Sequence, residues 1–180
     1  MSELQRFISV DVETAGPHPA EYSLLSIGAC LVSNPKIGFY TEIKPVNDRQ
    51  TPEAFSIHRL TLEELAANGD SPADAMADFE AWLSRNVPDG RPIFVAFNAP
   101  FDWMFVNDYF HRYLGRNPFG HSALDIKAYY MGRFGVAWAE TTMALVAERV
   151  LGHQELSHHA LKDAQDQAEM FQRIHRASSP

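Results

Sequence analysis

Apolar runs of strand length alternate along the chain with amphipathic stretches of helix length. The runs that predict strands lie at about 6–13, 23–33, 37–45, 93–97 and 122–126. Asn34-Pro35 predicts the turn between the second and third strands. The first three strands follow one another with short connections, so they predict an antiparallel meander.

Helix signals dominate the remainder of the chain. Thr61-Leu62-Glu63-Glu64 and Ser71-Pro72-Ala73-Asp74 match the capping pattern of a helix start. Further helices are predicted from Ala99-Pro100 to about Leu114, near 140–150 and from about 158 to 175. Antiparallel strands followed by alternating strands and helices predict an α/β fold, with a mixed sheet covered by helices. We expect one domain over residues 1–176 and a frayed tail at 177–180.

Composition narrows the possible classes of protein. The chain has 180 residues, is 46% hydrophobic and carries a formal net charge of −8. This charge argues against nonspecific coating of nucleic acid, which relies on Lys and Arg, but allows an enzyme that holds a few nucleotides. The single cysteine, Cys30, lies in an apolar run and is expected in the core. No signal peptide and no apolar run of about 20 residues is visible, which predicts a cytoplasmic protein without a membrane span.

Two acidic residues interrupt the first predicted strand. Asp11 and Glu13 are two positions apart in Phe7–Thr14, so both project from the same face of the strand. Neighbouring carboxylates on an apolar strand repel each other and lose hydration. A hard divalent cation bound by oxygen ligands offsets that cost, which makes the pair a candidate metal site.

Two more carboxylates lie on or beside apolar helix faces. Asp102 falls within the apolar arc of its helix, and Asp163 lies at the border of the apolar stripe of the last helix. A capping or dipole role for Asp102 and a solvated position for Asp163 remain open alternatives. His159 is an i, i+4 neighbour of Asp163, whereas His158 reaches the same place only from the first turn. A surface histidine cluster is the alternative for both.

The order of these residues resembles the DEDDh family of 3′→5′ exonucleases, which contains ribonuclease T and the proofreading subunit of bacterial DNA polymerase III. The resemblance rests on three motifs and a looser fourth one, Asp11-Val12-Glu13-Thr14, Asn98-Ala99-Pro100-Phe101-Asp102, His158-His159-Ala160-Leu161-Lys162-Asp163 and Ile57-His58-Arg59-Leu60-Thr61. It implies a ribonuclease H-like fold, with a mixed five-stranded sheet flanked by helices. Phe97 replaces a common His, Arg59 a usual Gly and Ala15 a common Thr, which leaves the substrate contacts in question.

The resemblance also implies a reaction. The chain would be a metal-dependent hydrolase that removes nucleoside 5′-monophosphates from the 3′ end of single-stranded DNA or RNA, or from short oligonucleotides. Two Mg²⁺ ions, with Mn²⁺ as a substitute, would be held by Asp11, Glu13 and Asp163, and by Asp102 directly or through water. His158 would be the general base, because its spacing to Asp163 selects it over His159.

Substrate contacts are implied with less precision. The candidates near the terminal nucleotide and the scissile bond are Thr14, Ala15, His58, Asn98 and Phe101. Phe97 and Phe55 could stack on bases, with core packing as the alternative. Four cations could guide the strand or form a solvated surface, namely Arg112, Arg116, Lys127 and Arg133.

Two other classes of protein remain open. One is a non-catalytic module that binds nucleic acid or a polymerase with the same fold. The other is a globule that metal merely stabilises. A homo-oligomer or a polymerase partner is equally undecided by the sequence.

Overall fold

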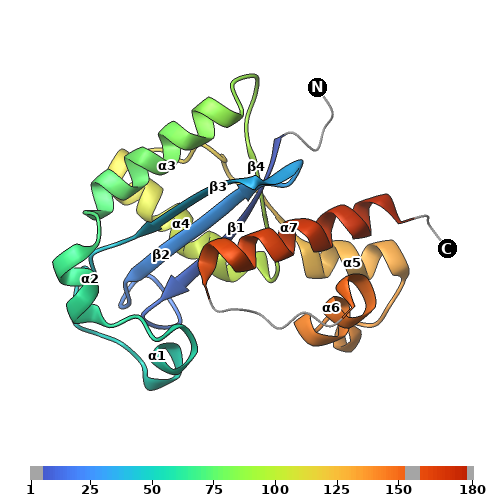
Figure 1. Ribbon diagram of the computed structural model, residues 1–180, viewed down its shortest axis with the longest axis horizontal. Coiled ribbons are helices and arrows are strands. Elements are labelled where there is room, and N and C mark those ends of the chain that lie inside the picture. The colour runs from blue at the N-terminus through green and yellow to red at the C-terminus, as the bar shows by residue number, and fades with distance from the viewer. Residues whose placement is uncertain (1–5, 153–158, 178–180) are drawn as a thin grey trace.

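One mixed five-stranded sheet, in the order β3-β2-β1-β4-β5, forms the centre of the protein (Figure 1). The computed structural model describes residues 6–152 and 159–177. The strands are β1 (Phe7–Thr14), β2 (Leu24–Leu31), β3 (Asn34–Glu42), β4 (Ile93–Ala96) and β5 (Ala123–Asp125). β1, β2 and β3 pair antiparallel, whereas β4 pairs parallel with both β1 and β5. The predicted ribonuclease H-like mixed sheet flanked by helices is therefore confirmed.

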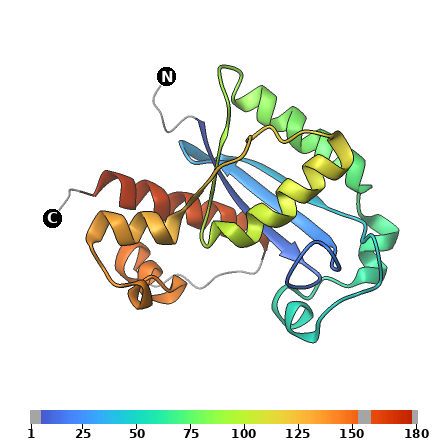
Figure 2. The same ribbon diagram turned by 180° about the vertical axis from the view of Figure 1, so that it is seen from behind.

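Helices cover both faces of the sheet. They are α1 (Pro52–His58), α2 (Leu62–Asn68), α3 (Pro72–Asn86), α4 (Ala99–Leu114), α5 (Ile126–Phe134), the short 3-10 helix η2 (Trp138–Glu140), α6 (Met143–Leu151) and α7 (Ala160–Arg176). α3 and α4 pack against one face, and α5, α6 and α7 against the other. α7 crosses the sheet in Figure 1, and α4 is seen on the opposite face in Figure 2.

The alternation of β1 decides which face receives the acidic residues. Ile8, Val10 and Val12 join the core cluster that contains α3 and α4 residues. Phe7 joins the cluster under α7, and every second residue after it projects to that same face. Asp11 and Glu13 consequently face α7 rather than α4.

A close approach of α7 to the sheet depends on Gly28 in β2. Gly28 pairs with Asp11, and a Cβ atom at Gly28 would lie 2.1 Å from backbone atoms of Ala160 and Leu161. Only glycine lets the first turn of α7 lie directly on the strand at this point. The result is that the start of α7 lies beside Asp11.

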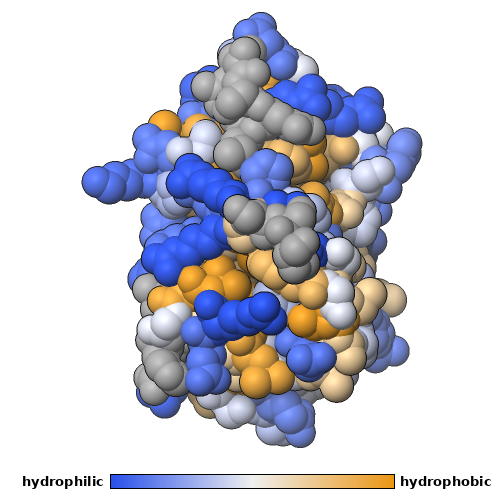
Figure 3. Space-filling view, turned by 90° about the vertical axis from the view of Figure 1, so that its right-hand side faces the viewer, coloured by the Kyte–Doolittle hydropathy of each residue, from blue (hydrophilic) through white to orange (hydrophobic). Residues whose placement is uncertain are grey.

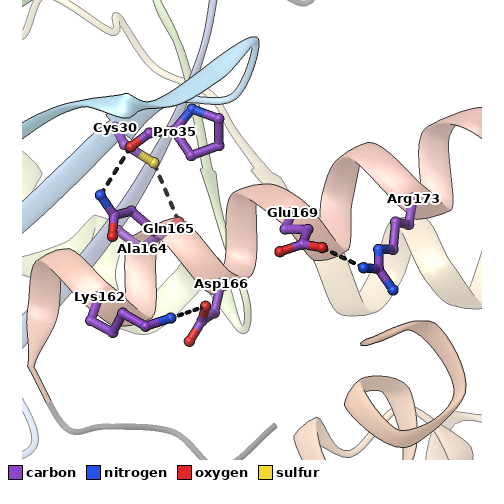
Figure 4. Close-up of polar contacts among 8 residues, drawn as sticks. All are labelled: Cys30, Pro35, Lys162, Ala164, Gln165, Asp166, Glu169 and Arg173. Carbon is purple, nitrogen blue, oxygen red and sulfur yellow. Dashed lines mark hydrogen bonds and ion pairs between the residues drawn. The ribbon is translucent and has the colours of Figure 1, made fainter. Parts of the chain in front are cut away.

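Polar contacts hold α7 against the β2–β3 hairpin (Figure 4). The Cys30 thiol donates to the carbonyl of Ala164 at 3.5 Å, and the Gln165 amide donates to the carbonyl of Pro35 at 3.0 Å. Cys30 is fully buried, as expected for a structural cysteine. Successive turns of α7 are joined by ion pairs between Lys162 and Asp166 and between Glu169 and Arg173 (Figure 4).

One local prediction is wrong, two helices were not predicted, and one predicted helical stretch consists of two helices. The β2–β3 turn is formed by residues 32–33, whereas Asn34-Pro35 opens β3, because an edge strand tolerates proline. α1 and α5 were not predicted at all, although Thr51 and Asp125 cap them. The stretch predicted near 140–150 is η2 followed by α6.

The end of α1 explains one departure from the resembled family. Arg59 caps this helix with φ +58°, a left-handed conformation that suits glycine and strains a side chain. The left-handed backbone at this position therefore explains why the resembled family usually has glycine here.

Among the described residues, no helix is both long and apolar enough to cross a bilayer. On the side shown in Figure 3, hydrophilic side chains are interspersed with apolar ones.

Candidate metal centre and nucleotide cavity

Three carboxylates from distant parts of the chain converge between β1 and α7. Asp11 and Glu13 come from β1, and Asp163 comes from the first turn of α7. One ligand oxygen from each lies within 4.8 Å of the other two. Glu13 and Asp163 are buried, and Asp11 is half-buried. The predicted ligands Asp11, Glu13 and Asp163 are thus brought together.

Protonation of these acids reflects their crowding. Burial raises the pKa of Asp11 well above its usual value, and repulsion from Asp102, Glu13 and Asp163 adds to the effect. Burial, followed by repulsion from Asp163, raises the pKa of Glu13 to about 7. A divalent cation would offset both the lost hydration and the repulsion between the carboxylates. The chemistry of the donor set therefore fits a metal ion bound by oxygen.

Asp102 belongs to the same cavity but not to the compact group of three. It lies in the first turn of α4, where the amide of Val12 donates to its Oδ1 at 3.2 Å. Burial raises the pKa of Asp102 to about 8, and the hydrogen bond from Val12 opposes that shift. All four acids line a cavity of about 220 Å³, together with Val12, Phe97, Asn98, Phe101, Met143 and Gln167.

Gln167 is a site residue that the sequence reading missed. Its Nε2 donates to Asp11 Oδ1 at 2.7 Å, and its Oε1 accepts from the Phe97 amide at 2.8 Å. Gln167 is 3% exposed, so this amide bridges Asp11 to the end of β4 inside the protein. Its position four residues after Asp163 on α7 places it on the same helix face, a signal that the sequence offered.

A second cavity, of about 470 Å³, adjoins the first. Val12, Glu13 and Phe101 line both cavities. The rest of the larger cavity is lined by Thr14, Gly16, Pro17, Thr51, Glu53, Ala54, Ile57 and His58. Its volume falls within the range usual for pockets that bind small molecules. α1, which the sequence reading missed, supplies one wall.

Two predicted substrate residues in this larger cavity have defined hydrogen bonds. The Thr14 hydroxyl donates to the carbonyl of Gly16 at 2.9 Å. His58 Nδ1 accepts from the Leu60 amide at 2.9 Å. Burial lowers the pKa of His58, which keeps its imidazole neutral near pH 7 and leaves Nε2 as the protonated nitrogen.

Other predicted contacts are placed differently. Ala15 is fully buried and lines neither cavity, because its amide donates to Ser23 and its carbonyl accepts from Thr51. Asn98 lines the smaller cavity in a left-handed conformation, with its amide donating to Asp125. Phe101 lies on the wall between the two cavities.

The two phenylalanines that were candidates for base stacking lie in different environments, and only one of the two neighbouring histidines is described. Phe97 packs against the core cluster under α7, whereas core packing is wrong for Phe55, which is 43% exposed on α1. His158 lies outside the described residues. The ring of the adjacent His159 stacks on Tyr40, with 4.5 Å between ring centroids.

Sequence comparisons agree with this geometry. The model of the Exonuclease family matches residues 8–171. The 3′-5′ DNA exonuclease Cap18 of Escherichia coli is 46% identical over 173 residues, which cover 96% of this chain and 92% of Cap18. Ribonuclease T of Shewanella denitrificans is 30% identical over 178 residues, which cover 91% of this chain and 77% of that enzyme.

Solved structures share the fold at low sequence identity. The nuclease domain of 3′hExo, a DEDDh family member bound to rAMP, superposes with a TM-score of 0.74 and 17% identity, over 94% of this chain and 90% of that domain. E. coli Exonuclease I in complex with a dT13 oligonucleotide gives 0.70 and 19%, over 91% of this chain and 39% of that protein. The converging acids and the family match lead to one conclusion: the chain belongs to the Exonuclease family and is a hydrolase of the DEDDh type, a divalent-metal-dependent 3′→5′ exonuclease.

Proposed function

We propose that the enzyme removes nucleoside 5′-monophosphates from the 3′ end of single-stranded DNA, with two Mg²⁺ ions held by Asp11, Glu13, Asp163 and Asp102. The observation that carries this proposal is the wall shared by the two cavities. Glu13 and Phe101 separate an acidic cavity suited to metal ions from a larger one suited to a nucleotide. A terminal nucleotide in the larger cavity would bring the preceding phosphate to the acids.

The reaction is the attack of water on phosphorus, with cleavage of the bond between phosphorus and the O3′ of the preceding nucleotide. Divalent ions held by these carboxylates would activate the water and stabilise the leaving oxygen. Gln167 donates to Asp11 Oδ1 and so orients this carboxylate, and the imidazole of His58 lines the nucleotide cavity. The resemblance assigns the water proton to His158, whose ordinary pKa of about 6.5 suits a base near neutral pH.

The choice of DNA rests on the relatives. The relative with 46% identity carries the name of a DNA exonuclease, and the relative with 30% identity that of a ribonuclease. RNA is therefore the second candidate, since a protein distinguishes the two sugars through contacts to the 2′-hydroxyl.

A cleavage ladder tests the proposal. Single-stranded DNA and RNA of one sequence, labelled at the 5′ end, are incubated with Mg²⁺, Mn²⁺ or chelator. We expect stepwise shortening of the DNA from its 3′ end, lost with chelator and in Asp11→Asn. Asp166→Asn is the matched control, since Asp166 is a buried acid of α7 that lines neither active-site cavity. Faster cleavage of RNA would transfer the proposal to RNA, and no cleavage would favour a binding module.

Replacement of His158 tests the base assignment. We expect His158→Ala to lower kcat about 10²–10⁴-fold, the usual contribution of a general base, while metal binding measured by calorimetry persists. His159→Ala is the neighbouring control and should retain most activity. A near-normal kcat in His158→Ala would remove the assignment.

A further inference from the structure

The cations predicted to guide the strand do not share one environment. Arg112 pairs with Asp108 at 2.6 Å, and Arg116 makes a bidentate pair with Glu80. Both arginines are thus engaged by carboxylates of the fold.

The remaining two cations differ from each other as well. Arg133 donates to the carbonyl of Ala177 at the end of α7. Lys127 instead lies over the ring of Trp138, with its ammonium 4.4 Å from the ring centroid. Within the described chain, Lys127 has no carboxylate at ion-pair distance. Its charge is therefore available to an outside anion.

Trp138 is an unusually exposed aromatic residue. It is 56% exposed, the largest fraction among the exposed large apolar side chains of the described residues. The backbone of Trp138 is held in place, because its carbonyl accepts from the Thr141 hydroxyl at 2.7 Å and the residue opens η2. An exposed indole with a cation over its ring offers both a stacking surface and a positive charge.

Two features of the chain link Lys127 and Trp138 to the metal cavity, a shared hydrogen-bond acceptor and a short connection to α6. Asp125 Oδ1 accepts from the amides of Lys127 and of Asn98, a residue that lines the smaller cavity. Trp138 lies five residues before Met143, the first residue of α6 and another wall of that cavity.

The two cavities give a direction to the bound strand. α1 residues line only the larger cavity, and Met143 lines only the smaller one. α6 lies well apart from α1 in both views of the ribbon (Figures 1 and 2). A strand whose 3′ nucleotide lies against α1 and whose scissile phosphate lies at the acids would leave on the α6 side.

We infer that Lys127 and Trp138 form a binding subsite for the single strand upstream of the scissile bond. A base stacks on the indole of Trp138, and the Lys127 ammonium contacts a backbone phosphate. The inference rests on the proposed function, because it takes the strand direction from it. It names no base preference, since every base presents a face that can stack.

A comparison of substrate lengths tests the subsite. The dinucleotide dT2 supplies one nucleotide upstream of the scissile bond, whereas dT8 supplies seven and therefore reaches farther toward the subsite. In Trp138→Ala, we expect the ratio of kcat/KM for dT8 to that for dT2 to fall about tenfold or more, through the KM for dT8. Trp138→Phe should restore most of the ratio. Leu145→Ala is the matched control, because Leu145 is a comparably exposed apolar residue of α6 at 47%.

Lys127 has its own readout. In Lys127→Gln, the slope of log KM for dT8 against log salt concentration should become shallower by about 0.7, the contribution of one phosphate contact to a single strand. An unchanged slope would overturn the phosphate contact.

Other outcomes decide against the subsite. Equal losses on dT2 and dT8 would show that Trp138 supports the fold, and an unchanged ratio would show that the strand does not reach it. If the wild-type enzyme cleaves neither substrate, the proposed function fails separately. The subsite is then judged by the affinities of fluorescent dT2 and dT8 for wild-type protein and Trp138→Ala, with the same expected ratio.

Discussion

The neighbours of Asp11 have opposite effects on the pKa of its carboxyl group. Burial and three nearby carboxylates favour the protonated acid, whereas the hydrogen bond from Gln167 favours the carboxylate. The acids were predictable because their charge contrasts with the apolar residues around them. Gln167 was not found, since an uncharged amide on the last helix carries no such contrast.

Because Gln167 donates to Asp11, we expect it to act on the reaction through that carboxylate, as a positioning residue. We expect Gln167→Leu to lower kcat about tenfold or more and to raise the metal concentration needed for half-maximal activity. The KM for DNA should change little, because Gln167 lines only the metal cavity. Metal titrations of the nuclease rate give the first two quantities, and substrate titrations give the third.

Gln165→Leu is the control on the same helix. Gln165 donates to the Pro35 carbonyl and lines neither active-site cavity, so its loss should affect stability more than kcat. Equal kcat values for the two leucine variants would contradict a positioning role for Gln167.

At the scale of elements, the close contact between α7 and β2 at Gly28 sets how near the carboxylate of α7 lies to those of β1. Gly28 lies opposite Asp11 in the sheet and directly beneath the first turn of α7. Asp163 belongs to that turn, so the separation of helix and strand also sets the position of this carboxylate. The strand and the helix could each be predicted from the sequence. The role of Gly28 could not, because it depends on the contact between the two elements.

The substitution Gly28→Ala tests this close contact between α7 and β2. We expect a loss of about 1–3 kcal/mol in the free energy of unfolding, because the added methyl group meets backbone atoms that cannot rotate away. Metal affinity should fall with it. Urea unfolding and calorimetric metal titration measure the two effects.

Gly132→Ala, in α5, is the contrasting variant. A Cβ atom there meets nothing within 4 Å, so the substitution should stabilise the helix by about 0.5–1 kcal/mol. A Gly28→Ala protein as stable as Gly132→Ala would show that α7 does not depend on the close contact.

The two helices that were not predicted, α1 and α5, show which elements leave no hydrophobic pattern in the sequence. α1 spans only Pro52–His58, and it buries His58 alone, so it has no apolar stripe to detect. α5 follows β5 without an intervening loop, and a single residue, Asp125, ends the strand and caps the helix. β1 and β2 were found because they are apolar runs of strand length that are buried on both faces of the sheet. α3 and α4 were found because each buries a regular apolar stripe.

At the scale of the whole molecule, the acidic centre links stability to pH. Glu13 and Asp102 have pKa values of about 7 and about 8 in the folded protein, above their ordinary values near 4. Between these limits the folded protein holds more protons than the unfolded chain. The contribution of these two acids to the free energy of unfolding of the metal-free protein therefore falls as pH rises from about 4 to about 8.

A thermal-shift series tests this linkage. In chelator, the contribution of these acids should lower Tm between about pH 5.5 and pH 8, and Mg²⁺ should raise Tm more at pH 8 than at pH 5.5. Asp102→Asn should raise the Tm of the metal-free protein at pH 8 by about 3 °C or more. The exposed Asp89→Asn should leave Tm unchanged. An Asp102→Asn protein that melts lower than wild type in chelator at pH 8 would contradict the linkage.

The acidic group also joins β1, the first strand of the fold, to α7, its last helix, and this connection has a consequence for the growing chain. During synthesis, Asp11, Glu13 and Asp102 leave the ribosome well before Asp163. A nascent chain can pair β1 with β2 and dock α4, yet its carboxylate set lacks the residue that α7 brings. We therefore expect nuclease activity to begin only when translation has passed α7, at the docking step that buries the second apolar face of the sheet.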